Sequence, residues 1–222
     1  RRREAYVGQW LPEPLLTSPD VAEDVELAES VSMALLVVLE TLSPTERAVF
    51  VLREVFGAPY EEIAEAVGKS PAAVRQIAHR ARRHVDARRP RRAASLGEAR
   101  EASESFWRAI ETRDLQGLFD VLAPDVVWVG DGGGLRQAAL HPIVGAGKVV
   151  RLIAGILDRA DGVVTAHLAL LNGGPALVVR VGGELDGVVA LRVENGRITG
   201  IYYVRNPEKL TRVDRQTPLA LR

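Results

Sequence analysis

The sequence of 222 residues contains no cysteine. This absence excludes disulfide bonds, a thiolate nucleophile and zinc sites with cysteine ligands, and it suits a reducing compartment. The histidines show no zinc-binding spacing either; they are His79, His84, His141 and His167. We therefore expect no metal site and no cofactor.

Long hydrophobic runs are also absent. One of the longest, residues 163–171, is well short of the roughly 18 residues that span a bilayer, and no signal peptide is visible. We expect a cytoplasmic protein that does not contact a membrane. The chain begins with three arginines rather than methionine, and we expect it to be part of a longer protein.

The net charge is zero, so the overall electrostatics indicate neither nucleic acid nor membrane as a partner. The charges are unevenly distributed, however. Between residues 13 and 65 the charged side chains are almost all acidic, whereas between residues 69 and 92 they are basic except for Asp86. Any nucleic-acid contact is therefore expected in this short basic segment.

The composition changes near Pro90, which ends the basic helix, and residues 93–97 resemble a linker. The preceding segment is helical in pattern, with Ser43, Pro44 and Glu46 in the positions of a capped helix start. After the linker, helices are predicted over residues 98–112, 115–122 and 147–159. Hairpin turns are predicted at residues 172–174, 182–183 and 195–196. The sequence therefore predicts an all-α domain followed by an α+β domain.

Residues 60–85 have the pattern of a helix-turn-helix. The first helix covers residues 60–67, Gly68 forms the turn, Ser70 caps the second helix and Pro71 begins it. The spacing predicts that the second helix buries Val74, Ile77, Ala78, Ala81 and Val85.

The outer face of this second helix is cationic: Arg75, Gln76, His79, Arg80, Arg82 and Arg83. A basic helix alone is typical of a solvated surface, but the capped helix-glycine-helix frame favours DNA binding. Arginine can donate two hydrogen bonds to guanine, and glutamine can bind adenine in the same way. Arg82, Arg83 and Arg88 suit phosphate contacts. For His79, a DNA contact and a packed or solvated imidazole both remain open.

Residues 41–85 resemble region four of bacterial extracytoplasmic-function (ECF) sigma factors, which reads the −35 promoter element and contacts the polymerase flap. "YVGQWLPEPL" (residues 6–15) resembles the linker after region two in the SigJ-like subgroup, whose members carry a C-terminal SnoaL-like domain of the NTF2-like fold. "GDGGG" (130–134) and "NPEKL" (206–210) resemble that subgroup's C-terminal signatures, with Glu208 where aspartate is more usual. Region two is missing except in part at residues 1–4, so this chain is not expected to start transcription alone.

The resemblance implies a sigma factor whose partners are promoter DNA and the RNA polymerase core, and whose C-terminal domain regulates its activity. It implies a linker over residues 1–20, region four over 21–92, an NTF2-like cone over 98–210 and a tail over 211–222. The implied DNA-binding residues are Ser70, Arg75, Gln76, His79, Arg80, Arg82 and Arg83. The implied interdomain or regulatory residues are Trp10, Leu11, Pro12, Glu13, Asp131, Gly132, Gly133, Gly134, Asn206, Pro207, Glu208, Lys209 and Leu210.

The segment around Trp10 and Leu11 carries two prolines and should be extended, yet these two side chains are costly to leave in water. They could pack against their own helical domain. Alternatively, as the family implies, they could dock on the C-terminal domain or on region two and so set sigma activity. The sequence leaves both possibilities open.

An NTF2-like cone encloses an apolar pocket that serves isomerases, cyclases and ligand-binding domains alike. An Asp131–His167 pair could abstract a proton next to a carbonyl. However, a mid-strand histidine is typical of a packed core, and an aspartate before glycines is typical of a loop carboxylate that caps backbone amides.

We expect a non-catalytic domain that could bind an unknown small molecule. A SnoaL-type isomerase, cyclase or ligand sensor fused to a DNA-binding domain is the alternative. Candidate pocket residues are Trp107, Trp128, His167, Arg180 and Tyr202, with Asp131 and Asn206.

Overall fold

The computed structural model describes residues 6–17, 32–87 and 94–214. Contacts divide them into two compact units: residues 32–87 form a helical unit, and residues 6–17 join residues 94–214 in a sheet unit. We call residues 6–17 the strap. Arg88, residue 93 of the predicted linker and residues 215–222 of the predicted tail lie outside the described residues, whereas residues 211–214 belong to a described helix.

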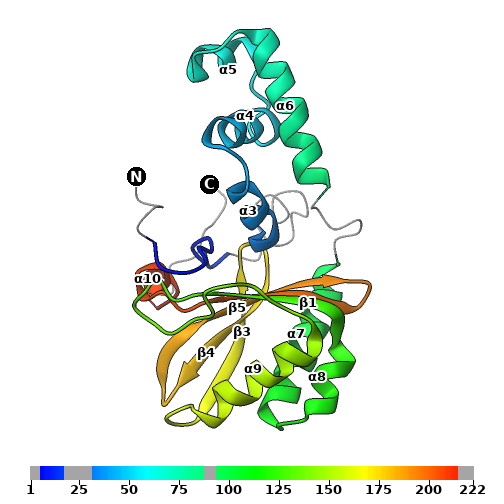
Figure 1. The fold of residues 1–222 in the computed structure, drawn as a ribbon, viewed down its shortest axis with the longest axis vertical. Coiled ribbons are helices and arrows are strands. Elements are labelled where there is room, and N and C mark those ends of the chain that lie inside the picture. The colour runs from blue at the N-terminus through cyan, green and yellow to red at the C-terminus, as the bar shows by residue number, and fades with distance from the viewer. Residues whose placement is uncertain (1–5, 18–31, 88–93, 215–222) are drawn as a thin grey trace. The chain divides into compact units, whose positions relative to one another are not determined.

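The helical unit consists of α3 (Met33–Glu40), α4 (Pro44–Glu54), α5 (Tyr60–Val67) and α6 (Pro71–Asp86) (Figure 1). One core cluster joins α3, α4 and α6 around Leu39, Phe50 and Val85. A second joins α4, α5 and α6 around Val49, Ile63 and Val74, so the other helices bury one face of α6 along its whole length.

Local signals in the sequence explain where these helices begin and end. Ser43 and Glu46 form the predicted capping box of α4, with Pro44 at the first helical position. Gly68 ends α5 in the left-handed conformation, at φ 65°, which glycine adopts without steric cost. The predicted caps are therefore confirmed.

The sheet unit begins, after the strap, with α7 (Leu96–Glu111) and α8 (Leu115–Val121) and continues with β1 (Leu122–Asp131), β2 (Ile143–Val144) and α9 (Ala146–Asp158). Four strands follow: β3 (Val164–Leu171), β4 (Gly174–Val181), β5 (Glu184–Glu194) and β6 (Arg197–Val204). The last described element is α10 (Pro207–Asp214). The predicted helices and the α+β class are confirmed.

The six strands form one sheet in the order β2-β1-β6-β5-β4-β3. All neighbours are antiparallel except β1 and β6, which are parallel. The predicted turns connect β3 to β6 in succession, and Asn172 and Asn195 adopt positive φ there before a glycine, as type I′ hairpins require.

Helices α7, α8 and α9 lie on one face of the curved sheet (Figure 1). Phe106 of α7 and Val149 of α9 pack with Trp128, Val189 and Ile201 of the strands in one core. This cone of helices and sheet is the architecture that the resemblance implied. Among the described helices, none is long and apolar enough to cross a membrane.

Candidate functional site

The second helix of the helix-turn-helix, α6, presents its charged side chains to solvent. Its N-terminus is capped by the Ser70 hydroxyl, which accepts a hydrogen bond from the Ala73 amide at 3.3 Å. The five side chains that the spacing assigned to the core are all buried: Val74, Ile77, Ala78, Ala81 and Val85. The six polar residues assigned to the outer face are all exposed: Arg75, Gln76, His79, Arg80, Arg82 and Arg83.

These outer side chains differ in how far they are already engaged. Arg82 donates to Glu54 of α4 at 2.5 Å, and this hydrogen bond raises the pKa of the Arg82 guanidinium. Arg75 lies 3.7 Å from Glu61 and above the Tyr60 ring. Arg80 and Arg83 form no ion pair with any described residue. Four side chains line one shallow hollow on the helix surface: Arg75, Gln76, His79 and Arg80.

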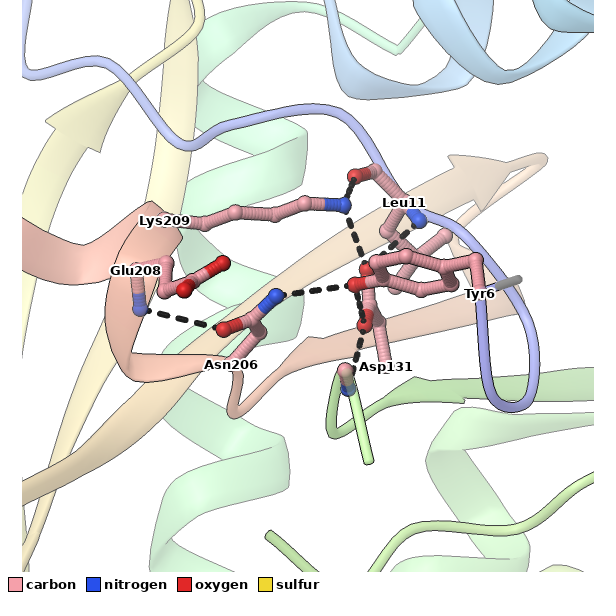
Figure 2. Close-up of polar contacts among 7 residues, drawn as sticks. Tyr6, Leu11, Asp131, Asn206, Glu208 and Lys209 are labelled. Carbon is pink, nitrogen blue, oxygen red and sulfur yellow. Dashed lines mark hydrogen bonds and ion pairs between the residues drawn. The ribbon is translucent and has the colours of Figure 1, made fainter. Parts of the chain in front are cut away.

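A second site lies in the sheet unit, where Asp131 at the end of β1 is completely buried. One carboxylate oxygen accepts hydrogen bonds from the Tyr6 hydroxyl at 2.5 Å and the Gly133 amide at 3.0 Å. The other accepts from the Leu11 amide at 2.8 Å and from Lys209 Nζ at 2.7 Å (Figure 2). Asp131 therefore caps backbone amides, as expected, and also connects the strap to α10.

The start of α10 completes this arrangement, which we call the strap latch: Tyr6, Leu11, Asp131, Asn206 and Lys209. Asn206 donates to the Tyr6 hydroxyl at 2.9 Å and accepts from the Glu208 amide at 3.0 Å (Figure 2). Lys209 also donates to the Leu11 carbonyl at 2.5 Å. Three sequence motifs thus meet at one buried carboxylate.

The glycines after Asp131 are required by close packing. A Cβ on Gly132 would lie 1.9 Å from the Arg136 carbonyl oxygen, and one on Gly133 would lie 2.3 Å from Asn206 Nδ2. Gly133 also has φ 61°, a conformation that other residues rarely adopt. A side chain on Gly133 would displace the Asp131 loop from Asn206, and one on Gly132 would displace it from the Arg136 backbone.

The far end of the strap pairs with the β3–β4 hairpin. The Leu15 carbonyl accepts from the Asn172 amide at 2.8 Å, and the Thr17 amide donates to the Leu170 carbonyl at 2.9 Å. Leu16 and Leu171 form an isolated β-bridge. The strap is therefore held at both ends to the sheet unit.

The apolar side chains of the strap are buried unequally. Leu11 is completely buried, and Pro12 and Pro14 are buried beside it. Trp10 is 37% exposed, with Lys209 Nζ 4.0 Å from its ring centroid. The expectation that Trp10 would be buried with Leu11 is corrected: its ring stays partly exposed while it contacts the Lys209 cation.

The remaining motif residues contribute in different ways. Leu210 is buried, and Glu13 forms a 3.5 Å ion pair with Arg212 of α10. The side chains of Pro207 and Glu208 are exposed. Glu208 enters the latch only through its backbone amide, which explains why glutamate can replace aspartate there.

Comparisons with known proteins show the family of the chain. Residues 32–85 match the family model "Sigma-70, region 4". The chain is 36% identical to the ECF RNA polymerase sigma factor SigJ of Mycobacterium tuberculosis, over 95% of this chain and 72% of that protein. The chain belongs to the ECF sigma factor family. It is also 35% identical to the probable ECF sigma factor SigI of the same organism, over 95% of this chain and 70% of that protein.

The crystal structure of M. tuberculosis SigJ superposes on this sigma factor with a TM-score of 0.75. The two chains share 34% sequence identity, and the match covers 94% of this chain and 76% of the other. The likeness therefore extends over both units rather than over region four alone.

Burial changes the proton affinities of the latch in this sigma factor. Burial lowers the pKa of Lys209, although the hydrogen bond and charge of Asp131 oppose this effect. Burial and the hydrogen bond to Asp131 raise the pKa of Tyr6 above its usual value. Tyr6 therefore stays a neutral donor to Asp131. Sequence reasoning did not single out Tyr6, although it is the first residue of the strap motif.

A cavity of about 520 Å³ lies between α9 and the sheet. Among the predicted pocket residues, Trp128 lines it, whereas Trp107 lines a separate hollow with Glu104 and Arg108 of α7. Sequence reasoning missed the polar groups of the cavity, which come from segments outside its candidate set: Arg136, Gln137, Asp186, Tyr203 and Arg205.

The predicted pocket residues Arg180, His167 and Tyr202 do not line this cavity. Alternate residues of a strand face opposite sides of a sheet, and Val179 and Val181 face the cavity, so Arg180 between them points away. His167 pairs with Val178 on that other face and is exposed, which also corrects the expectation of a packed core histidine. Tyr203, not Tyr202, faces the cavity.

Proposed function

We propose that this sigma factor reads the −35 promoter element through α6, and that the sheet unit regulates the sigma factor through the strap latch without catalysing a reaction. Its partners would be promoter DNA and the RNA polymerase core, which would place it in the cytoplasm. The observation that carries the regulatory part is the burial of Asp131 between the strap and α10.

The DNA-reading part is supported by the separation of faces on α6. Its buried face is wholly apolar, and its outer face carries three donors in one hollow that have no partner among the described residues: Gln76, His79 and Arg80. Side chains that are not held by neighbours can turn toward base edges in the major groove.

The regulatory part is supported by the chemistry of the latch. A hydrogen bond to a charged group contributes about 1.5 to 3 kcal/mol, and burying Leu11 contributes about as much. The docked strap is therefore a stable conformation rather than a loosely attached segment, and a partner that binds the released strap would shift the equilibrium away from docking. The strap precedes region four in the chain. Docking or release of the strap can therefore change how region four, and any segment before the strap, is presented to the polymerase.

The absence of catalysis is proposed from the position of the candidate acid-base pair. The hydrogen bonds of Asp131 come from Tyr6, Leu11, Gly133 and Lys209, and it is completely buried. His167 is exposed on β3 and takes no part in this network. This arrangement suits a structural carboxylate rather than a general base that must reach a substrate.

The test is transcription by core polymerase with the complete sigma factor, which includes region two, carrying Tyr6→Phe. The substitution keeps the ring but removes the hydroxyl that joins Asp131 to Asn206. We expect the equilibrium constant for docking of the strap to fall about tenfold and promoter-specific transcription to change. Glu208→Ala is the matched control, because its side chain is exposed and only its backbone serves the latch. Unchanged transcription with a measurably undocked strap would refute the regulatory proposal.

A further inference from the structure

The cavity of the sheet unit has an apolar side and a polar end. The apolar side is formed by Leu152 and Ile156 of α9 and by Val164, Val179 and Val181 of β3 and β4. The polar end is formed by Trp128 of β1 with the segment that contains Arg136 and with Arg205 after β6. A volume of about 520 Å³ is in the usual range for small-molecule sites.

At the polar end, the charge of the Asp186 carboxylate is balanced by Arg205, whereas two hydrogen-bond donors have no partner among the described residues. Asp186 receives two hydrogen bonds from Arg205, at 2.6 and 2.9 Å, and one from the Tyr203 hydroxyl. The Arg136 guanidinium has no ion pair or hydrogen bond to any described residue. The Trp128 indole N–H likewise has no hydrogen-bond acceptor among the described residues.

These free donors belong to the same end of the cavity. A Cβ built on Gly130 would lie 3.4 Å from both Trp128 Nε1 and the Ala138 side chain, which places the indole nitrogen beside the segment that follows Arg136. Arg136 is itself exposed, and further exposed charges of both signs complete the lining, from Arg159, Asp161 and Glu184. Two unpaired donors, one of them a cation, next to an apolar wall match a ligand with one anionic oxygen group on an apolar body.

The polar end is built from the segments that form the strap latch. The Arg136 amide donates to the Gly132 carbonyl at 3.0 Å, within the loop that begins at Asp131. The Asp131 carbonyl accepts hydrogen bonds from the amides of Arg205 and Asn206, at 2.7 and 3.0 Å. A ligand in the cavity that holds Arg136 and Arg205 in place would therefore restrain the loop after Asp131, which holds the strap.

We propose that the cavity binds a small amphipathic carboxylate, with its anion at Arg136 and Trp128, and that its binding tightens the strap latch. This inference rests on the proposed regulatory role of the latch and adds the chemical class of the ligand that would control it. Because linkage is reciprocal, a docked strap must strengthen carboxylate binding by the same factor by which the carboxylate strengthens docking.

Binding is tested by calorimetric titration of the chain, residues 1–222, with octanoate, octan-1-ol and octylammonium. These probes differ chiefly in the head group, because the alkyl chain of octanoate is only one methylene shorter than that of the other two, a difference that acts against octanoate. We expect octanoate to bind at least about tenfold more tightly than the other two, and Arg136→Gln to remove that preference. Arg151→Gln is the matched control, because Arg151 is an exposed arginine of α9 outside the cavity. Equal binding of the three probes, or no loss with Arg136→Gln, would overturn the proposal.

Coupling is tested by hydrogen exchange of the strap with and without saturating octanoate. The Leu11 amide, which donates to Asp131, should exchange more slowly with octanoate, and Tyr6→Phe should weaken octanoate binding. Octanoate binding without either effect would overturn the link to the latch. Neither measurement involves transcription, so failure here is distinct from failure of the regulatory proposal, which would show as unchanged transcription by the Tyr6→Phe variant.

Discussion

At the residue scale, the two sites use charge in opposite ways. Arg80 and Arg83 are exposed and unpaired among the described residues, so their charge remains available for a partner. Asp131 is completely buried, and its charge is matched by Lys209 and by three further donors. A free surface cation suits reversible binding to DNA, whereas a buried and satisfied carboxylate fixes a conformation, because leaving it unpaired would be costly.

Alanine substitutions on α6 should separate base reading from phosphate binding. Arg80→Ala should cost about 1 to 3 kcal/mol on a matching −35 duplex and less on a scrambled one. Arg83→Ala should weaken binding to both duplexes alike and reduce the salt dependence by about one charge. Arg82→Ala should have a smaller effect than Arg83→Ala, because Glu54 already holds that guanidinium. Fluorescence anisotropy at several salt concentrations measures all three variants. Equal losses on the two duplexes for Arg80→Ala would contradict base reading.

At the element scale, the sequence predicted best the features that nearby residues determine. The cap of α4, the turn at Gly68 and the hairpins at Asn172 and Asn195 depend on a few adjacent residues, and all were predicted. The buried stripe of α6 was also predicted, because its period is unambiguous.

Predictions that depended on long-range pairing were less successful. The β4 strand is well buried on both faces, so its run of valines does not indicate which residues face the cavity. The sequence analysis therefore assigned Arg180 to the cavity, whereas its neighbours Val179 and Val181 line it. The partner of the strap could not be chosen either. The side chain of Leu11 needs only an apolar site, and the groups that hold its backbone in place, Asp131 and Lys209, are more than a hundred residues away in the chain.

The ends of β5 and β6 are joined by the pair between Asp186 and Arg205, and this pair gives a pH-dependent prediction. Burial alone would raise the pKa of Asp186, but hydrogen bonds from Arg205 and Tyr203 hold it below its usual value of 3.8. The stabilisation that Asp186 provides is therefore fully present above pH 3.8 and is lost as the pH falls through the lower pKa of the folded state. Asp186→Asn should lower the free energy of unfolding by about 3 kcal/mol at pH 7, and the deficit should shrink below pH 3.8.

Urea unfolding of the chain at pH 7 and at successively lower pH measures this deficit. Asp161→Asn is the matched control, since Asp161 is exposed and has no ion pair within the described residues. A deficit that stays constant across the pH range would show that the asparagine disturbs packing rather than removing a charge pair.

At the scale of the whole molecule, the strap latch and the helix proposed to read DNA lie in separate compact units. All described contacts of the latch lie within the sheet unit, although its strap precedes the helical unit in the chain. Region four is thus inserted, along the sequence, between two segments of one folded unit. Region four therefore belongs to the stretch of chain whose two ends are joined when the strap docks, and undocking separates those ends without changing any residue of α6.

This connectivity predicts that latch and DNA affinity can be separated by truncation. Deleting residues 206–222 removes Asn206 and Lys209, which leaves the Asp131 carboxylate without its cation and the Tyr6 hydroxyl without one partner. We expect the truncated chain to bind a −35 duplex as tightly as the intact chain, because no residue of the helical unit is lost. In the complete sigma factor, the same deletion should change promoter-driven transcription by core polymerase.

Deleting only residues 215–222 is the control, because it retains every described latch contact. A loss of duplex affinity in the longer deletion would show that the sheet unit supports the DNA-reading helix directly, and unchanged transcription with a folded protein would show that the latch carries no regulation.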